Sequence, residues 1–188
     1  MSFNNDFTFC PKCGGKNIHF IIKYWKCDDC QFVLYHNAAS ASGLIISDNE
    51  NNVLFEIRAK DPKKGMLGCP GGFTDNDETI EESAIRECRE ELGLEPKDLE
   101  YLCSSPNDYH YKGIDYKSCD IYFTAKLPNE KNLKDIVKLD KTEVNGICFK
   151  KIEKKSDIDE LPIAFSSLRN ALFVWVKKYG KKKDYLLI

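Results

Sequence analysis

Four cysteines near the start of the chain constrain its fold more than any other feature. They form two Cys-x-x-Cys pairs separated by thirteen residues, and they are Cys10, Cys13, Cys27 and Cys30. This spacing is typical of a tetrahedral structural zinc site, with iron in a similar thiolate site as the alternative. Four protein ligands leave no open position for a water, so we expect the metal to hold the fold without catalysing. The sequence therefore predicts a zinc ribbon over residues 1–36.

Composition and charge exclude several broad classes of protein. The 188 residues contain nine cysteines, an odd number that argues against a complete disulfide framework. The first residues lack the basic start and apolar stretch of a signal peptide, and no apolar run approaches the ~20 residues of a membrane span. We therefore expect a cytoplasmic protein that does not cross a membrane. The formal net charge of -2 is not typical of a general nucleic-acid binder.

Strands and helices alternate in the remainder of the chain, residues 37–188, which we expect to form a second domain. Strands are predicted at 43–46, 53–58, 121–125 and 144–150, and a long loop at 59–77. A helix is predicted from about Thr79 to Leu92, with Asp77 as its N-cap and Gly93 as its end. The helix expected at 166–179 combines core and surface positions, and we predict no site residue on it.

Three glutamates on the first predicted helix point to chemistry. Glu87 and Glu90 are three residues apart and Glu87 and Glu91 are four apart, so their side chains share one face. Carboxylates this close repel one another unless a cation lies among them. Oxygen ligands suit Mg²⁺ or Mn²⁺, which keep several waters and engage phosphates. The alternative is a solvated acidic face, which is common on helices.

The spacing around these glutamates resembles the signature of the Nudix hydrolases. Its fixed positions are Gly72, Glu78, Arg86, Glu87, Glu90, Glu91, Gly93 and Leu94. Cys88 takes a position where an aliphatic residue is usual, and we expect it to face the core. The resemblance implies an α/β fold of the mixed α+β type. In this fold, helices enclose a mixed β-sheet in an α/β/α sandwich, here preceded by the small zinc ribbon.

The same resemblance implies roles for individual residues. Glu87, Glu90 and Glu91 would ligate Mg²⁺ or Mn²⁺, with one further bond from the carbonyl of Gly72. Arg86 and Glu78 would fix the geometry between the loop and the helix. The catalytic base would be Glu90 or, alternatively, Glu143, which precedes a predicted strand and is otherwise a surface charge.

A zinc ribbon before a Nudix domain resembles the architecture of the NADH pyrophosphatases. Of the motif that follows the Nudix helix in that family, only Ser104 and Pro106 agree here. The resemblance implies cleavage of a nucleoside diphosphate linked to X, namely ADP-ribose, NADH or a related dinucleotide, to a mononucleotide and phosphorylated X. The alternatives are removal of an RNA cap, including an NAD cap, and a catalytically silent nucleotide-binding module. A homodimer is the assembly expected by analogy.

Four further residues are candidates for substrate contacts. Arg58 and Lys60 end a predicted strand beside the glycine-rich loop, where they would contact phosphate or remain solvated. Tyr109 and Tyr111 would stack on a base at the rim of a pocket, or else pack as ordinary strand residues.

Overall fold

The chain divides into two compact units, Met1–Ala38 and Ala39–Ile188. The computed structural model describes residues 7–111, 114–126 and 137–181 of these units. Among the described residues, no helix has the length and apolar character needed to cross a bilayer.

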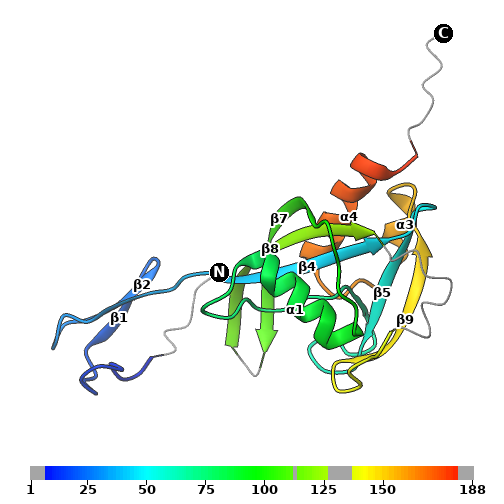
Figure 1. The fold of residues 1–188 in the computed structure, drawn as a ribbon. Coiled ribbons are helices and arrows are strands. Elements are labelled where there is room, and N and C mark those ends of the chain that lie inside the picture. Colours follow the sequence, from blue (N-terminus) through cyan, green and yellow to red (C-terminus); the bar gives the residue numbers. More distant parts are fainter. Residues whose placement is uncertain (1–6, 112–113, 127–136, 182–188) are drawn as a thin grey trace, which may run out of the picture. The chain divides into compact units, whose positions relative to one another are not determined.

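The first unit is a three-stranded antiparallel sheet. Its strands are β1 (Ile18–Ile21), β2 (Tyr24–Cys27) and β3 (Val33–Tyr35), in the order β1-β2-β3 (Figure 1). The buried core of this sheet consists of Cys10, Ile18, Trp25 and Cys27. Because this core is so small and includes two of the four cysteines, a metal held by those cysteines would stabilise the unit.

The second unit is built on a mixed six-stranded sheet. Its strands are β4 (Ala39–Ser47), β5 (Asn52–Arg58), β6 (Leu67–Gly68), β7 (Glu100–Tyr111), β8 (Ile114–Lys126) and β9 (Val144–Lys151). The order is β6-β5-β4-β8-β7, and β9 pairs with β5. β4 and β8 are parallel, whereas the other pairs are antiparallel. The predicted strands are present, while β6 lies within the segment predicted to be entirely loop.

Apolar side chains alternate between the two faces of this sheet, as the two-residue period of a strand requires. On β4, Leu44 and Ile46 pack with α1 (Ile80–Leu92), whereas Ile45 packs with α4 (Ser166–Tyr179). A helix therefore covers each face, and the predicted α/β/α sandwich is confirmed (Figure 1). The short helix α3 (Ser156–Asp159) lies beside α4.

The start of α1 differs from the prediction. Thr79 is the N-cap, not Asp77, because Thr79 forms a reciprocal capping box with Glu82. The Thr79 hydroxyl accepts the Glu82 N–H at 3.2 Å, and the Glu82 carboxylate accepts the Thr79 N–H at 2.8 Å. At the other end, Gly93 adopts the left-handed conformation with φ 68°, as predicted. Cys88 is fully buried, also as predicted.

Candidate active site

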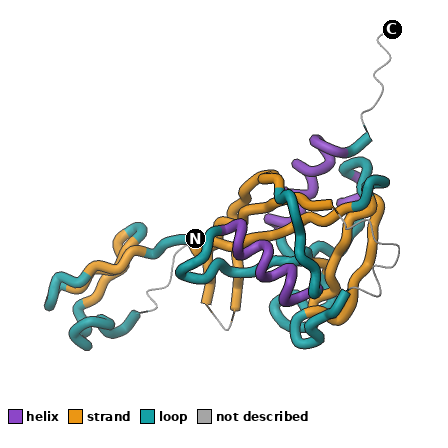
Figure 2. The backbone as a smooth tube through the Cα atoms, in the orientation of Figure 1, coloured by secondary structure: helices purple, strands orange, loops and turns teal. Residues whose placement is uncertain are grey.

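A glycine-containing segment crosses the first strand of the large sheet and forms one wall of the site. The N–H of Ser42 donates to the carbonyl of Gly72, and the N–H of Leu44 donates to that of Pro70, both at 2.9 Å. Gly71 has φ 153°, and a Cβ there would lie 2.2 Å from the carbonyl oxygen of Ser42. Glycine is therefore required at this position. It lies in the loop before α1, and Figure 2 draws loops in teal.

The carboxylates of α1 face this loop. Glu91 is 7% exposed and accepts the N–H of Gly71 at 2.9 Å. Burial raises the pKa of Glu91 to about 8, and burial also raises the pKa of Glu87. A Cβ on Gly72 would lie 2.3 Å from a Glu87 oxygen, so the loop and this carboxylate are in close contact. Glu90 lines the same cavity and is more exposed. A divalent cation would offset this concentration of buried negative charge.

Arg86 connects the helix to the loop. Its guanidinium donates to both oxygens of Glu78, at 2.6 and 3.0 Å, and to the carbonyl of Phe73 at 3.2 Å. It also donates to Glu87 at 2.9 Å and Glu90 at 3.1 Å. The hydrogen bonds from Arg86 lower the pKa of Glu78 to about 2. Such a forked pair fixes orientation as well as charge, so Arg86 holds the loop against the helix and orients two of the three glutamates.

The predicted substrate-contact residues lie along a cavity of about 390 Å³. Arg58 borders it and is held by the carbonyl of Pro62 at 2.9 Å and by the ring of Phe165. Lys60 forms an ion pair with Glu143, and both residues line the cavity. Tyr109 is also a lining residue. The side chain of Tyr111, by contrast, lies outside the part of the chain that the structure describes.

Several lining residues were not expected from the sequence. Leu168, on the helix for which no site residue was predicted, lines the cavity, as does Phe165 just before that helix. Asn107 and Asp120 contribute polar groups from the β7–β8 hairpin. The sequence signal for Asn107 and Asp120 was a polar residue within a strand segment. A strand pattern alone, however, does not show which cavity such a residue faces.

Glu56 is a second unexpected carboxylate, and it lies within the predicted apolar strand at 53–58. It is 4% exposed, and its Oε1 has no hydrogen-bond partner. Burial raises its pKa well above the usual range, and the charge of Glu91 raises it further. An acidic residue in an otherwise apolar strand was the signal that could have identified it. A buried carboxylate with one oxygen that has no partner among the described residues adds to the case for a cation near the α1 glutamates.

The four predicted metal-ligand cysteines come together in the first unit. Their sulfur atoms all lie within 4.8 Å of one another. The Sγ–Sγ distance is 3.7 Å between Cys10 and Cys30 and 3.8 Å between Cys13 and Cys27. Tetrahedral zinc with Zn–S bonds of ~2.3 Å places its sulfurs about 3.8 Å apart. The N–H of Gly15 donates to Cys13 Sγ at 3.4 Å, as in a metal knuckle. The arrangement therefore fits zinc.

Comparison with known proteins places these features in a family. The family model described as the NUDIX domain matches residues 36–161. A curated ADP-ribose pyrophosphatase from Methanocaldococcus jannaschii is 44% identical over 62 residues, which are 33% of this chain. An NAD-capped RNA hydrolase, NudC, from Vibrio atlanticus is 30% identical over 99 residues, or 52% of this chain. The chain spans 36% of the length of each of these relatives.

Solved structures agree with this match. A NUDIX hydrolase from Nitrosomonas europaea has a TM-score of 0.60 and 25% identity, with 90% of each chain covered. The NUDIX domain of Shewanella oneidensis NrtR, solved with ADP ribose, also has a TM-score of 0.60. It is 21% identical, over 77% of this chain and 90% of that domain. At this level of identity, the second likeness concerns the fold alone.

Proposed function

This chain belongs to the Nudix family, and we propose that it is a Mg²⁺- or Mn²⁺-dependent pyrophosphohydrolase. Its substrate would be a nucleoside diphosphate linked to X, such as ADP-ribose, NADH or a related dinucleotide. The products would be a mononucleotide and phosphorylated X. The observation that carries the proposal is the set of three carboxylates on α1, one of them buried, which line the same cavity as Arg58 and Tyr109.

The divalent metal would be held by Glu87, Glu90 and Glu91, with the carbonyl of Gly72 as a further ligand. That carbonyl already accepts one hydrogen bond, from Ser42, and its second lone pair is free for a metal. When bound, the metal supplies a Lewis acid that polarises the diphosphate and activates water. Burial raises the pKa values of Glu87 and Glu91, and a bound cation would stabilise the charged form of both carboxylates.

The remaining residues position the reaction. Water attacks one phosphorus of the diphosphate, the bridging P–O bond breaks, and the departing phosphate takes the electron pair. The proton from water passes to a carboxylate, which we assign to Glu90 or Glu143. Arg58 would bind phosphate oxygens through its guanidinium. Glu143 is paired with Lys60 and lies at the cavity, which supports a role beyond that of a surface charge.

The first unit would bind structural zinc through its four cysteines, with residues 1–36 as the ribbon and 37–188 as the Nudix domain. The distances between sulfur atoms support this assignment. A homodimer remains the proposed assembly.

A second candidate function is removal of an NAD cap from RNA. The similarity to NudC over half of this chain favours it. The same carboxylates would cleave the diphosphate of the cap, so the two functions differ only in what is attached to the nucleotide. A catalytically silent module is disfavoured, because each of the three α1 glutamates of the signature is retained.

Product analysis with Mg²⁺ tests the proposal. The panel would contain NADH, NAD, ADP-ribose, a diadenosine polyphosphate, a nucleotide sugar, the nucleoside triphosphates and NAD-capped RNA. We expect cleavage of ADP-ribose or a dinucleotide to a mononucleotide, and a loss of at least 100-fold in kcat for Glu90→Gln. If Glu143 is the base, Glu143→Gln should have a much lower kcat. The activity that remains should show a changed pH profile.

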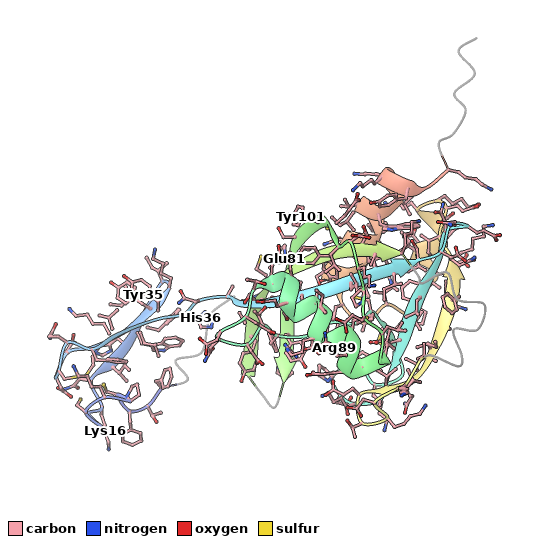
Figure 3. All side chains as sticks on the ribbon, in the orientation of Figure 1. Lys16, Tyr35, His36, Glu81, Arg89 and Tyr101 are labelled. Carbon is pink, nitrogen blue, oxygen red and sulfur yellow. The ribbon has the colours of Figure 1, made fainter. Side chains whose placement is uncertain are left out.

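Glu81→Gln is the matched control for these variants. Glu81 lies on the exposed face of the same helix (Figure 3). It should retain the activity of the unmodified protein. If metal-replete protein cleaves no member of the panel, the hydrolase proposal is wrong and the silent binding module gains support.

A further inference from the structure

Part of the cavity lining has no role in the hydrolysis of a diphosphate, and we call this part the β7–β8 end. It consists of residues of β7, of β8 and of the segment that leads into α4. These residues are Asn107, Tyr109, Ser118, Asp120, Tyr122, Phe165 and Leu168. The set combines aromatic rings with buried polar groups. Such a combination is suited to a flat ring with hydrogen-bonding atoms on its edge.

Asp120 is the most distinctive member of this set, being 8% exposed. Its Oδ1 accepts from the hydroxyl of Ser118, and its Oδ2 accepts from that of Ser167, both at 2.6 Å. Because Ser167 donates to Asp120, the hydroxyl of Tyr122 donates to Ser167, at 2.9 Å. Among the described residues, no ion pair neutralises Asp120. Each of its oxygens retains acceptor capacity for a ligand.

Asn107 is directly opposite Ser118 in the register of β7 and β8. Directly opposed residues share one face of a sheet, as do residues two apart on one strand, so Asn107 and Asp120 lie on the same face. Asn107 is 7% exposed and lines the cavity, and within the described part of the chain its side-chain amide forms no hydrogen bond. The amide is therefore open to the cavity, where it can donate to and accept from a ligand.

Aromatic rings stand beside these polar groups. Tyr109 follows Asn107 by two residues, and its ring lies between those of Phe73 and Phe165. The ring centroids are 5.5 Å apart for Tyr109 and Phe73 and 5.7 Å apart for Tyr109 and Phe165. The guanidinium of Arg58 lies 5.0 Å from the centroid of Phe165, which joins this end of the cavity to the proposed phosphate site.

We propose that this end binds the nucleobase and selects a purine with an exocyclic amine, such as adenine. The amine would donate to Asp120, and the adjacent ring nitrogen would accept from the amide of Asn107. The ring would stack against the aromatic cluster of Phe73, Tyr109 and Phe165. Asp120 is then the residue that determines base specificity. This inference rests on the proposed function for its substrate class.

Equilibrium binding without a divalent metal tests the inference separately from hydrolysis. The ligands are AMP and purine riboside monophosphate, which differs only in lacking the amine. A hydrogen bond to a charged acceptor is worth about 10-fold or more in affinity, so AMP should bind the unmodified protein at least 10-fold more tightly. In Asp120→Ala this ratio should fall to near one, because the acceptor is absent.

Asp108→Asn is the matched control. Asp108 is the exposed neighbour of Asn107 on β7, pairs with Lys117 and does not line the cavity. The AMP preference should survive in this variant. Asp120→Asn, which keeps the shape of the side chain, provides a second test in case the alanine variant does not fold. It should reduce the preference, because an amide is a weaker acceptor than a carboxylate.

Equal affinity of the unmodified protein for the two ligands would overturn the inference. A preference that persists undiminished in both Asp120 variants would overturn it as well. Neither result depends on catalysis. If the base preference holds and no substrate is cleaved, only the hydrolase proposal fails.

Discussion

Among the described residues, the core of the first unit contains four buried side chains, two of them cysteines, whereas the second unit buries an apolar layer on each face of a six-stranded sheet. A core as small as the first gives little hydrophobic stabilisation, and the proposed zinc would supply the remainder. The large core of the second unit supports features that destabilise a fold, including the buried carboxylates of Glu56 and Glu91. The buried residues of the first unit maintain its structure, whereas the buried carboxylates of the second unit lower the stability of its fold.

Removing one cysteine should have the largest effect. Cys27 is fully buried, and Cys27→Ser should abolish zinc binding and unfold the first unit, since structural zinc contributes on the order of 10 kcal/mol. Residues 39–181 should remain folded, because their core contains none of the four cysteines. Metal analysis and amide hydrogen exchange would measure both effects. The contrast between the two units would be wrong if the variant retained one zinc per chain. It would also be wrong if amide protection from exchange were lost throughout the second unit.

Arg86→Lys should damage activity while leaving zinc content unchanged. Lysine keeps the positive charge but cannot form the two parallel hydrogen bonds to Glu78. Loss of that geometry should displace the loop and the α1 glutamates, with a fall in kcat of about 100-fold. Steady-state kinetics on the best substrate of the panel would measure this fall in kcat. Arg89→Lys, on the exposed face of the same helix, should be close to neutral (Figure 3). Equal activities for the two variants would show that Arg86 does not position the loop and the α1 glutamates.

The buried carboxylates should make the metal-free protein less stable as pH rises. The pKa of Glu91 is raised from 4.5 to about 8, and that of Glu56 is also raised, so the folded state holds protons that the unfolded state releases. Stability that Glu91 contributes below pH 4.5 is therefore lost progressively as the pH rises to about 8, by up to about 1.4 kcal/mol per pH unit, and Glu56 adds a loss in the same direction.

Glu56→Gln should flatten this dependence, because it removes one of the two titrating groups. Urea unfolding of metal-free protein at several pH values between 5 and 8 would measure the slope. Glu81→Gln, whose side chain is exposed, should leave the slope as it is in the unmodified protein. Superimposable curves for Glu56→Gln and the unmodified chain would show that Glu56 does not titrate differently on folding.

Local spacing made much of this molecule predictable. The metal knuckles depend on two Cys-x-x-Cys pairs, and α1 depends on apolar residues at helical spacing, a glycine stop and glutamates three and four residues apart. Each of these patterns acts over a few residues, so its geometry follows from the backbone period. The N-cap was assigned incorrectly because Asp77 and Thr79 are both good capping residues, and only the reciprocal bonds with Glu82 distinguish them.

The sequence by itself determined the family signature, the carboxylate helix and the cysteine cluster. Only the tertiary structure placed Asn107 and Asp120 on one face beside Phe165, and Glu56 beneath the carboxylate helix. These residues come from β5, from the β7–β8 hairpin and from the residue before α4, three segments that are far apart in the chain. Their proximity depends on the register of β7 with β8 and on how α4 packs over the sheet. A shift of one residue in that register would turn every side chain to the opposite face, and no local pattern in the sequence fixes it.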